Sequence, residues 1–287
     1  MTAVAEAVGA WLPYPFELGF MQRALLACVA VGVFAPLIGT YLVQKRLSLI
    51  GDGIGHVAFA GVGAGLLAGT SALWTALAFA VAGSLGVEWL RGRRKASGDV
   101  ALAILFYSGI AAGVVLLSLG DALDASVLAY LFGQPLTVAT GEVLTIVAIG
   151  AAISAAMLAL RRPLFSIVTD DEWSRVAGLP VDLLNGLLAV LTAAAVVAAM
   201  RIVGILLVAA MMVLPVATAQ LVARSFRATL AIAVAVGVAA SVAGLAAARV
   251  WGLAPGGTIV LVAAGAFGAT AAVRRAAART PSVEGLP

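Results

Sequence analysis

The chain contains a series of apolar runs, most of them about 20 residues long, the length that a helix needs to cross a membrane. The runs cover approximately residues 19–44, 48–69, 71–90, 98–119, 137–160, 182–200, 202–222, 228–249 and 256–273. Polar and apolar residues do not alternate within them, so the pattern is not that of a transmembrane β-barrel. We therefore predict an all-α, polytopic helical membrane protein. It has eight or nine transmembrane helices, since the third, seventh and ninth runs are short or polar-flanked.

The composition agrees with this class of protein. Hydrophobic residues make up 63% of the chain and charged residues 10%, which excludes an ordinary soluble domain. The 32 glycines suit closely packed membrane helices. A net charge of +4 would suggest a nucleic-acid partner in a soluble protein, but here it reflects the side on which the arginines lie, and we predict no nucleic-acid binding.

The positions of the basic residues predict the orientation. Of the 17 Lys and Arg residues, 14 fall in connections at alternate ends of the runs, which the positive-inside rule makes cytoplasmic. The N-terminus is then outside and the C-terminus inside. Residues 1–287 form a single transmembrane domain, with an interfacial or periplasmic N-terminus at 1–18, a cytoplasmic loop at 161–181 and a cytoplasmic tail at 276–287. The N-terminus lacks the basic start of a signal peptide, so the first run is expected to be retained.

The second run holds a polar pair, Asp52 and His56, of which the latter is the only histidine of the chain. Residues four apart share one face of a helix, so the carboxylate and the imidazole point the same way. Counted from Leu47 at about 1.5 Å per residue, His56 lies roughly 13 Å along the run, near the middle of a hydrocarbon layer about 30 Å thick. Such a pair is costly at that depth unless it is paired, hydrated or functional.

The two side chains are suitable ligands for a divalent metal ion. Imidazole and carboxylate suit Zn²⁺, and Mn²⁺ or Fe²⁺ less selectively. Two ligands do not close a site, but a symmetric dimer would supply four. Two alternatives remain open at this point: the pair holds helices together by hydrogen bonds, or it relays protons in a secondary cation transporter.

Residues Asp170–Leu179, in the longest inward connection, predict a short amphipathic helix. Thr169 or Asp170 can cap its start, and Asp170, Asp171 and Glu172 lie at the positive end of its dipole. Trp173, Val176 and Leu179 share one face, and Gly178 precedes a proline that ends the helix. Because the acidic start disfavours anionic lipid, we expect a protein partner.

On the outward side, residues 120–138 form an acidic connection with a short helix broken by a turn near Gly133, and we expect a solvated loop. Arg201, at the outer end of a run, is expected to extend into water rather than pair with an acid. Pro215 lies inside a run and is expected to kink its helix.

Several catalytic motifs are absent. The only lysines, Lys45 and Lys95, are not preceded by glycine, so the chain has no P-loop for ATP. There is no His-Glu-x-x-His motif, and the helical neighbour of His56 is a carboxylate rather than a serine. We therefore expect a protein that is not an enzyme.

Taken together, these stretches resemble the permease subunit of bacterial ABC-type zinc, manganese and iron(II) importers, most of all the zinc permeases. Arg46–Ala58 is similar to the family's Leu-x-Gly-Asp-x-x-x-His signature, here with Gly51, Asp52, Gly55 and His56. Further similar stretches run from Phe20 to Arg275, and they contain Phe20–Leu26, Arg201 with Gly204, Pro215, and Pro255 with Gly256 and Gly257.

The resemblance implies a multi-pass protein of the bacterial inner membrane that works as a homodimer. A separate cytoplasmic ATPase and an extracytoplasmic metal-binding protein would be its partners. Asp52 and His56 would bind the transported ion, with Zn²⁺ favoured narrowly over Mn²⁺, and no permanent cofactor is implied. Asp170–Leu179 would be the helix that couples to the ATPase, through residues Asp170, Asp171, Glu172, Trp173, Val176, Ala177 and Gly178.

Overall fold

The computed structural model describes residues 14–92, 98–120 and 125–279. Within these ranges nine helices are long and apolar enough to cross a membrane, and no strand occurs. The prediction of a polytopic helical membrane protein is confirmed, with nine such helices rather than eight. They are α2 (Gly19–Gln44), α3 (Ile50–Leu67), α4 (Ala72–Gly92), α5 (Gly98–Leu119), α7 (Thr140–Ala159), α10 (Val181–Val203), α11 (Ile205–Val222), α12 (Phe226–Trp251) and α13 (Pro255–Arg279).

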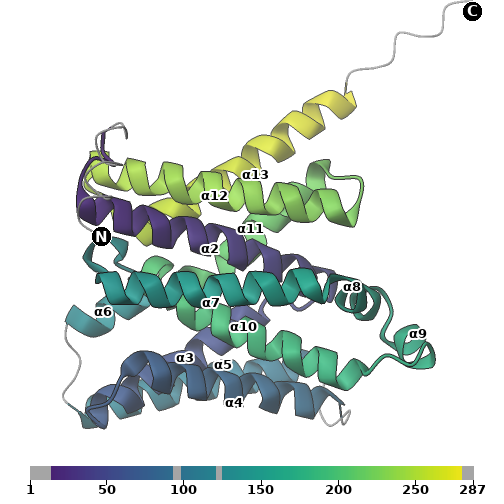
Figure 1. Cartoon of the computed structure of the whole chain (residues 1–287), viewed down its shortest axis with the longest axis horizontal. Coiled ribbons are helices and arrows are strands. Elements are labelled where there is room, and N and C mark those ends of the chain that lie inside the picture. Colours follow the sequence, from purple (N-terminus) through teal and green to yellow (C-terminus); the bar gives the residue numbers. More distant parts are fainter. Residues whose placement is uncertain (1–13, 93–97, 121–124, 280–287) are drawn as a thin grey trace, which may run out of the picture.

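Four short helices lie at the two ends of the bundle. Helix α6 (Ala125–Phe132) and the single turn η1 (Pro135–Thr137) lie at one end, and α8 (Arg161–Thr169) and α9 (Asp171–Val176) lie at the other. Figure 1 shows α6 at the left and α8 and α9 at the right of the long helices. The short helices therefore cover opposite ends of the bundle.

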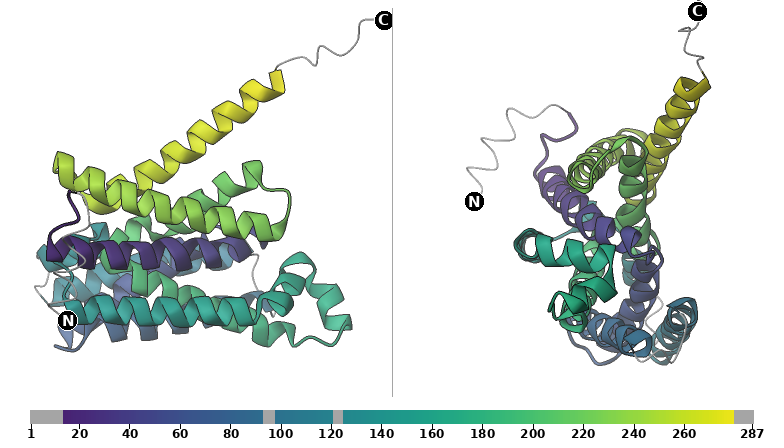
Figure 2. Two further views of the ribbon diagram at one scale, coloured as in Figure 1. Left: turned by 45° about the horizontal axis from the view of Figure 1, so that its top comes forward. Right: turned by 90° about the vertical axis from the view of Figure 1, so that its right-hand side faces the viewer.

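The long helices form three layers, with the most buried ones at the centre. Helices α2, α3 and α10 are the most deeply buried of the nine. Helices α12 and α13 pack together on one side of α2, and α4 and α5 both pack against α3 on the opposite side of the bundle (Figures 1 and 2). Most of the surface of α3 is therefore covered by neighbouring helices.

Small residues allow these helices to approach closely. Helices α2 and α12 cross at Gly32 and Gly237, where a Cβ atom on Gly237 would lie 2.5 Å from the carbonyl oxygen of Gly32. Backbone contact of this kind is the expected use of glycine in membrane helices.

The right-hand end in Figure 1, here called the basic end, carries the end of α2, the end of α4, helices α8 and α9, and the start of α12. Its basic residues include Lys45, Arg91, Arg161, Arg162 and Arg227. The alternation of helix ends gathers these charges as the sequence predicts. That this end faces the cytoplasm stays a prediction from the positive-inside rule.

Two boundaries differ from those expected. Helix α8 occupies the first half of the predicted loop 161–181, because Pro163 lies in its first turn, where no backbone N–H is required. Its buried Leu164 and Ile167 attach it to the bundle. Helix α13 continues to Arg279, so residues 276–279 of the predicted tail are helical, and residues 280–287 lie outside the described ranges. Most of the predicted N-terminal segment, residues 1–13, also lies outside them.

Candidate functional site

The polar pair lies on α3, and the glycines around it determine how closely the neighbouring helices approach. On one side, a Cβ atom at Gly51 would lie 3.1 Å from the Met212 sulfur, and one at Gly55 would lie 3.3 Å from Ile205. On the α5 side, a Cβ atom at Gly109 would lie 2.8 Å from the carbonyl carbon of His56. Helix α3 is therefore held between α11 and α5 at the level of His56.

The two members of the pair have different surroundings. His56 is only 7% exposed, and its ring contacts the Phe106 ring edge-on with 4.3 Å between centroids. Asp52 is half-buried and lines a cavity of about 260 Å³ together with Leu49, Phe106 and Tyr107. Tyr107 is 70% exposed, so this cavity lies at the surface formed by α3 and α5. Asp52 is thus accessible from the side of the protomer.

Neither side chain forms a hydrogen bond or an ion pair with any residue that the structure describes. The alternative in which the pair holds helices together by hydrogen bonds therefore finds no support here. Within the described ranges, no group of three or more His, Cys, Asp or Glu side chains could hold a metal ion. One protomer thus offers two candidate ligands.

The depth of His56 follows from where α3 begins. Arg46 adopts a positive φ of 59°, and the chain turns before α3 begins at Ile50. Asp52 therefore lies in the first turn of α3, and His56 lies about 9 Å beyond Ile50 in a helix about 27 Å long. Asp52 is thus close to the basic end, whereas His56 lies within about 5 Å of the helix midpoint, and its place near the middle of the membrane stays a prediction.

The predicted amphipathic helix exists as α9, capped by Asp170 rather than Thr169. The Asp170 carboxylate accepts a hydrogen bond from the Trp173 backbone N–H at 2.9 Å. The buried Ser174 hydroxyl donates to the Asp170 carbonyl at 2.7 Å and lies 2.8 Å from the Ser166 hydroxyl of α8. Helix α9 is therefore attached to α8 through Ser174.

The exposed surface of α9 carries two large apolar side chains beside charged ones. Trp173 is 67% exposed and Val176 is 81% exposed, while Asp171, Glu172 and Ala177 are also exposed. The helix ends at Val176 rather than Leu179, because Gly178 has a positive φ of 82° and redirects the chain. Leu179 consequently packs against the core and does not share the face of Trp173, which corrects the expected pattern.

Lys45 joins α9 to two transmembrane helices, an arrangement that sequence reasoning missed. Its ammonium group lies 3.2 Å from a carboxylate oxygen of Asp171 and 2.5 Å from the side-chain oxygen of Asn185 in α10. The Lys45 side chain is only 8% exposed. No signal in the sequence identifies these partners, which lie more than 100 residues further along the chain. Lys45 also directly follows α2 and precedes the turn into α3.

At the other end of the bundle, Arg201 forms an ion pair with Glu142, with 3.2 Å between nitrogen and oxygen, and lies 4.9 Å from the centroid of the Tyr130 ring. The prediction that Arg201 extends into water is wrong, because α6 and η1 cover it. Burial raises the pKa of Tyr130, and the Arg201 charge partly opposes that rise. The short helix and the turn near Gly133 that the sequence predicts are confirmed, but this connection is only partly solvated, since Val127 and Val138 are buried. Asp121 and Asp124 lie outside the described residues.

Three glycines meet beneath this covered arginine. A Cβ atom would lie 2.5 Å from the Ile202 carbonyl oxygen at Gly133, 2.4 Å from the Leu131 carbonyl oxygen at Gly204, and 2.3 Å from the Val203 carbonyl oxygen at Gly256. Pro255 begins α13, whereas a Cβ atom at Gly257 would meet no other part of the protein within 4 Å. Pro215 lies inside α11 as expected.

Comparison with known proteins matches the whole membrane domain. The model of the ABC 3 transport family matches residues 17–274. The chain is 32% identical to a probable iron transport system membrane protein of Haemophilus influenzae, over 90% of this chain and 94% of that protein. It is 30% identical to the manganese transport system membrane protein MntC of Halalkalibacterium halodurans, over 86% of this chain and 85% of that protein.

Solved structures give the same result for the fold. PsaBC from Streptococcus pneumoniae, solved in complex with Fab, matches with a TM-score of 0.80 and 29% identity, covering 94% of this chain and 95% of that one. An inward-facing putative metal-chelate type ABC transporter matches with a TM-score of 0.67 at 17% identity, which concerns the fold alone.

Proposed function

Because the chain belongs to the ABC 3 transport family, we propose that it forms the translocation path of an ATP-driven importer of Mn²⁺. It is a multi-pass metal-transport permease of the bacterial inner membrane, and ATP hydrolysis belongs to a separate subunit. Relatives named for manganese and iron favour these ions over the Zn²⁺ that the ligand types alone suggest.

The observation that carries the proposal is the position of Asp52 and His56. They lie one helical turn apart on α3, without other polar partners in the described chain, and Asp52 borders a surface cavity. Binding a cation would offset the free-energy cost of placing a carboxylate and an imidazole in a membrane helix. One pair is too few for a transition metal, so we propose that a second copy of the chain contributes its own pair.

The face that would meet the second copy is the surface of α3 and α5. Large apolar side chains, among them Leu49, Ile104 and Tyr107, are exposed beside the Asp52 cavity. Pairing two such faces about a two-fold axis would bring both Asp52 side chains to one pathway. The site would then hold up to four ligands, while remaining open enough to release the ion.

The exposed face of α9 is the proposed contact with the ATPase. Trp173 and Val176 present an apolar surface at the basic end, and Lys45 connects this helix to the turn that precedes α3. Closure of two ATPase subunits would move α9, and the Lys45 linkage would transmit that movement toward Asp52 and His56. This gives a physical route for alternating access.

The test is uptake of labelled Mn²⁺, Fe²⁺ and Zn²⁺ into liposomes that contain the permease with its ATPase and binding protein. ATP-dependent uptake is expected for the wild type, preferentially of Mn²⁺, and His56→Ala should abolish it. Thr270→Ala is the matched control, because the Thr270 hydroxyl bonds only the Ala266 carbonyl of its own helix at 2.8 Å.

Two outcomes would contradict the proposal. Uptake that survives the loss of His56 would remove this residue from the pathway. Uptake driven by a proton gradient without ATP would instead favour the secondary cation transporter in which the pair relays protons.

A further inference from the structure

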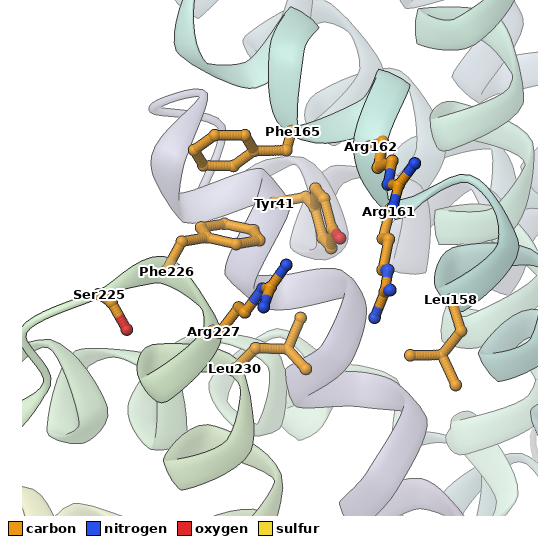
Figure 3. Close-up of a pocket in the computed structure, with 9 residues that line it drawn as sticks. All are labelled: Tyr41, Leu158, Arg161, Arg162, Phe165, Ser225, Phe226, Arg227 and Leu230. Carbon is orange, nitrogen blue, oxygen red and sulfur yellow. The ribbon is translucent and has the colours of Figure 1, made fainter.

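A second cavity, of about 520 Å³, lies at the basic end, remote from the Asp52 cavity in sequence and in its lining. It is formed where the end of α2, the end of α7, helix α8 and the start of α12 meet. Arginines 161, 162 and 227 line it together with aromatic and aliphatic side chains (Figure 3). The cavity therefore joins segments of the chain that are far apart in sequence.

The charge of this cavity is not balanced by the protein. None of the residues that line it is acidic. The salt bridges found among the described residues do not include Arg161, Arg162 or Arg227. Guanidinium groups stay charged at all physiological pH values, so three positive charges converge on one space. An anion is the natural occupant.

The rest of the lining is apolar and extends along the transmembrane helices. The Tyr41 ring packs edge-on against Phe226 with 5.1 Å between centroids, and Phe226 lies 4.8 Å from Phe165. Figure 3 shows Leu158 and Leu230 on one side of the Arg161 and Arg227 side chains and Phe165 on the other. Leu158 belongs to α7 and is exposed on its outer surface.

We propose that this cavity binds an anionic phospholipid, whose headgroup phosphate contacts Arg161 and Arg227 and whose acyl chain lies along Leu158 and Leu230. Arginine is the preferred side chain for phosphate, because its planar fork donates two parallel hydrogen bonds. Basic pockets between transmembrane helices at the membrane surface are suited to lipid headgroups. The combination of a charged level and an apolar level matches a lipid, whereas a soluble phosphate would use the arginines alone.

The consequence for the fold is a polar bridge beside the aromatic contact that Phe165 of α8 already makes with Phe226 of α12. A phosphate held between Arg161 and Arg227 would connect the start of α8 to the start of α12. Helix α8 carries α9 through the Ser166–Ser174 contact, so the lipid would steady the segment that presents Trp173. This inference concerns lipid binding only and does not depend on which ion is transported.

The experiment measures the lipid that the permease retains. The permease–ATPase complex is reconstituted in vesicles of equal parts phosphatidylglycerol and phosphatidylcholine and extracted in detergent, and its bound lipids are counted by native mass spectrometry. Phosphatidylglycerol should be retained several-fold over phosphatidylcholine by the wild type, and Arg161→Gln/Arg227→Gln should lose that preference. Arg46→Gln/Arg175→Gln removes the same charge from two exposed residues that do not line this cavity, and should keep the preference. An equal loss in both double variants would overturn the proposal, because the effect would then be one of total charge.

A second variant tests the apolar level without altering the arginines. Leu158→Trp fills the aliphatic part of the cavity from an exposed position, so the fold should tolerate it. It should lower phosphatidylglycerol retention, and millimolar inorganic phosphate should not displace the lipid from the wild type. Displacement by inorganic phosphate, with retention unaffected by Leu158→Trp, would show an anion site without a lipid and overturn the proposal.

Discussion

At the scale of single residues, the most informative position is Gly109 on α5. It has no side chain, and the backbone of α3 at His56 occupies the space that a Cβ atom would take. The aromatic residues beside it, Phe106 and Tyr107, form the wall of the candidate metal site. The position of His56 therefore depends on Gly109, a residue that has no side chain to bind the metal.

Gly109→Ala should destabilise the protein by about 1–3 kcal/mol, because the added methyl group overlaps the backbone of α3. It should also displace His56 and lower metal uptake. The control is Gly86→Ala on α4, where no atom lies within 4 Å of the new methyl group. A glycine in the interior of a helix costs about 0.5–1 kcal/mol relative to alanine, so this variant should gain stability. Thermal unfolding of both variants measures the difference, and equal behaviour would contradict the packing described.

At the scale of helices, the connection between α9 and the bundle rests on Lys45. Its charge is largely buried and is satisfied by Asp171 and Asn185, whereas the pair of Arg175 and Asp182 nearby is exposed to water. Buried and exposed ion pairs contribute differently to stability, since solvent screening limits the contribution of an exposed pair to about 0–1 kcal/mol. The two pairs therefore provide a matched comparison.

Lys45→Met keeps much of the side-chain volume but removes the link between α2, α9 and α10. We expect residues 170–178 to exchange amide hydrogens faster, and metal-stimulated ATP hydrolysis by the complex to fall. Arg175→Gln should change neither, because its partner stays solvated. Hydrogen exchange followed by mass spectrometry and an ATPase assay test both variants. Unchanged exchange in Lys45→Met would show that Ser166 and Ser174 alone hold α9.

At the scale of the whole molecule, the helices can be predicted from local sequence patterns. The contacts between distant helices cannot. The nine helices follow from apolar length, and the shared face of Asp52 and His56 follows from helical spacing. The capping of α9 follows from Asp170. No local pattern predicts the partners of Lys45, the contact of Phe106 with His56 or the covering of Arg201, because each depends on how distant helices pack. The Arg201 error has this cause: a single helix gives no indication that α6 lies over its end.

The pair formed by Arg201 and Glu142 connects α10 with α7, while Tyr130 adds α6 to the same contact. Arg201→Gln should lower the unfolding free energy by about 1–3 kcal/mol, since hydrogen bonds to charged groups of this kind are lost and Glu142 keeps only the hydrogen bond from the Ala139 backbone N–H. The double variant Arg201→Gln/Glu142→Gln should recover part of the loss. Thermal denaturation in detergent or nanodiscs measures both, and additive losses would mean that the two residues act independently.

The meeting of Gly133, Gly204 and Gly256 also has a genetic consequence. Backbone atoms of the opposing segments lie within 2.6 Å of the place that a side chain would start at each of the three. Every amino acid that replaces glycine through a single-base change has a Cβ atom, so none of these codons has a neutral missense neighbour. Saturation mutagenesis should recover glycine alone at the three positions, while Gly257, which has open space around it, should accept many replacements. We therefore expect that no single amino-acid substitution is tolerated where these three glycines meet.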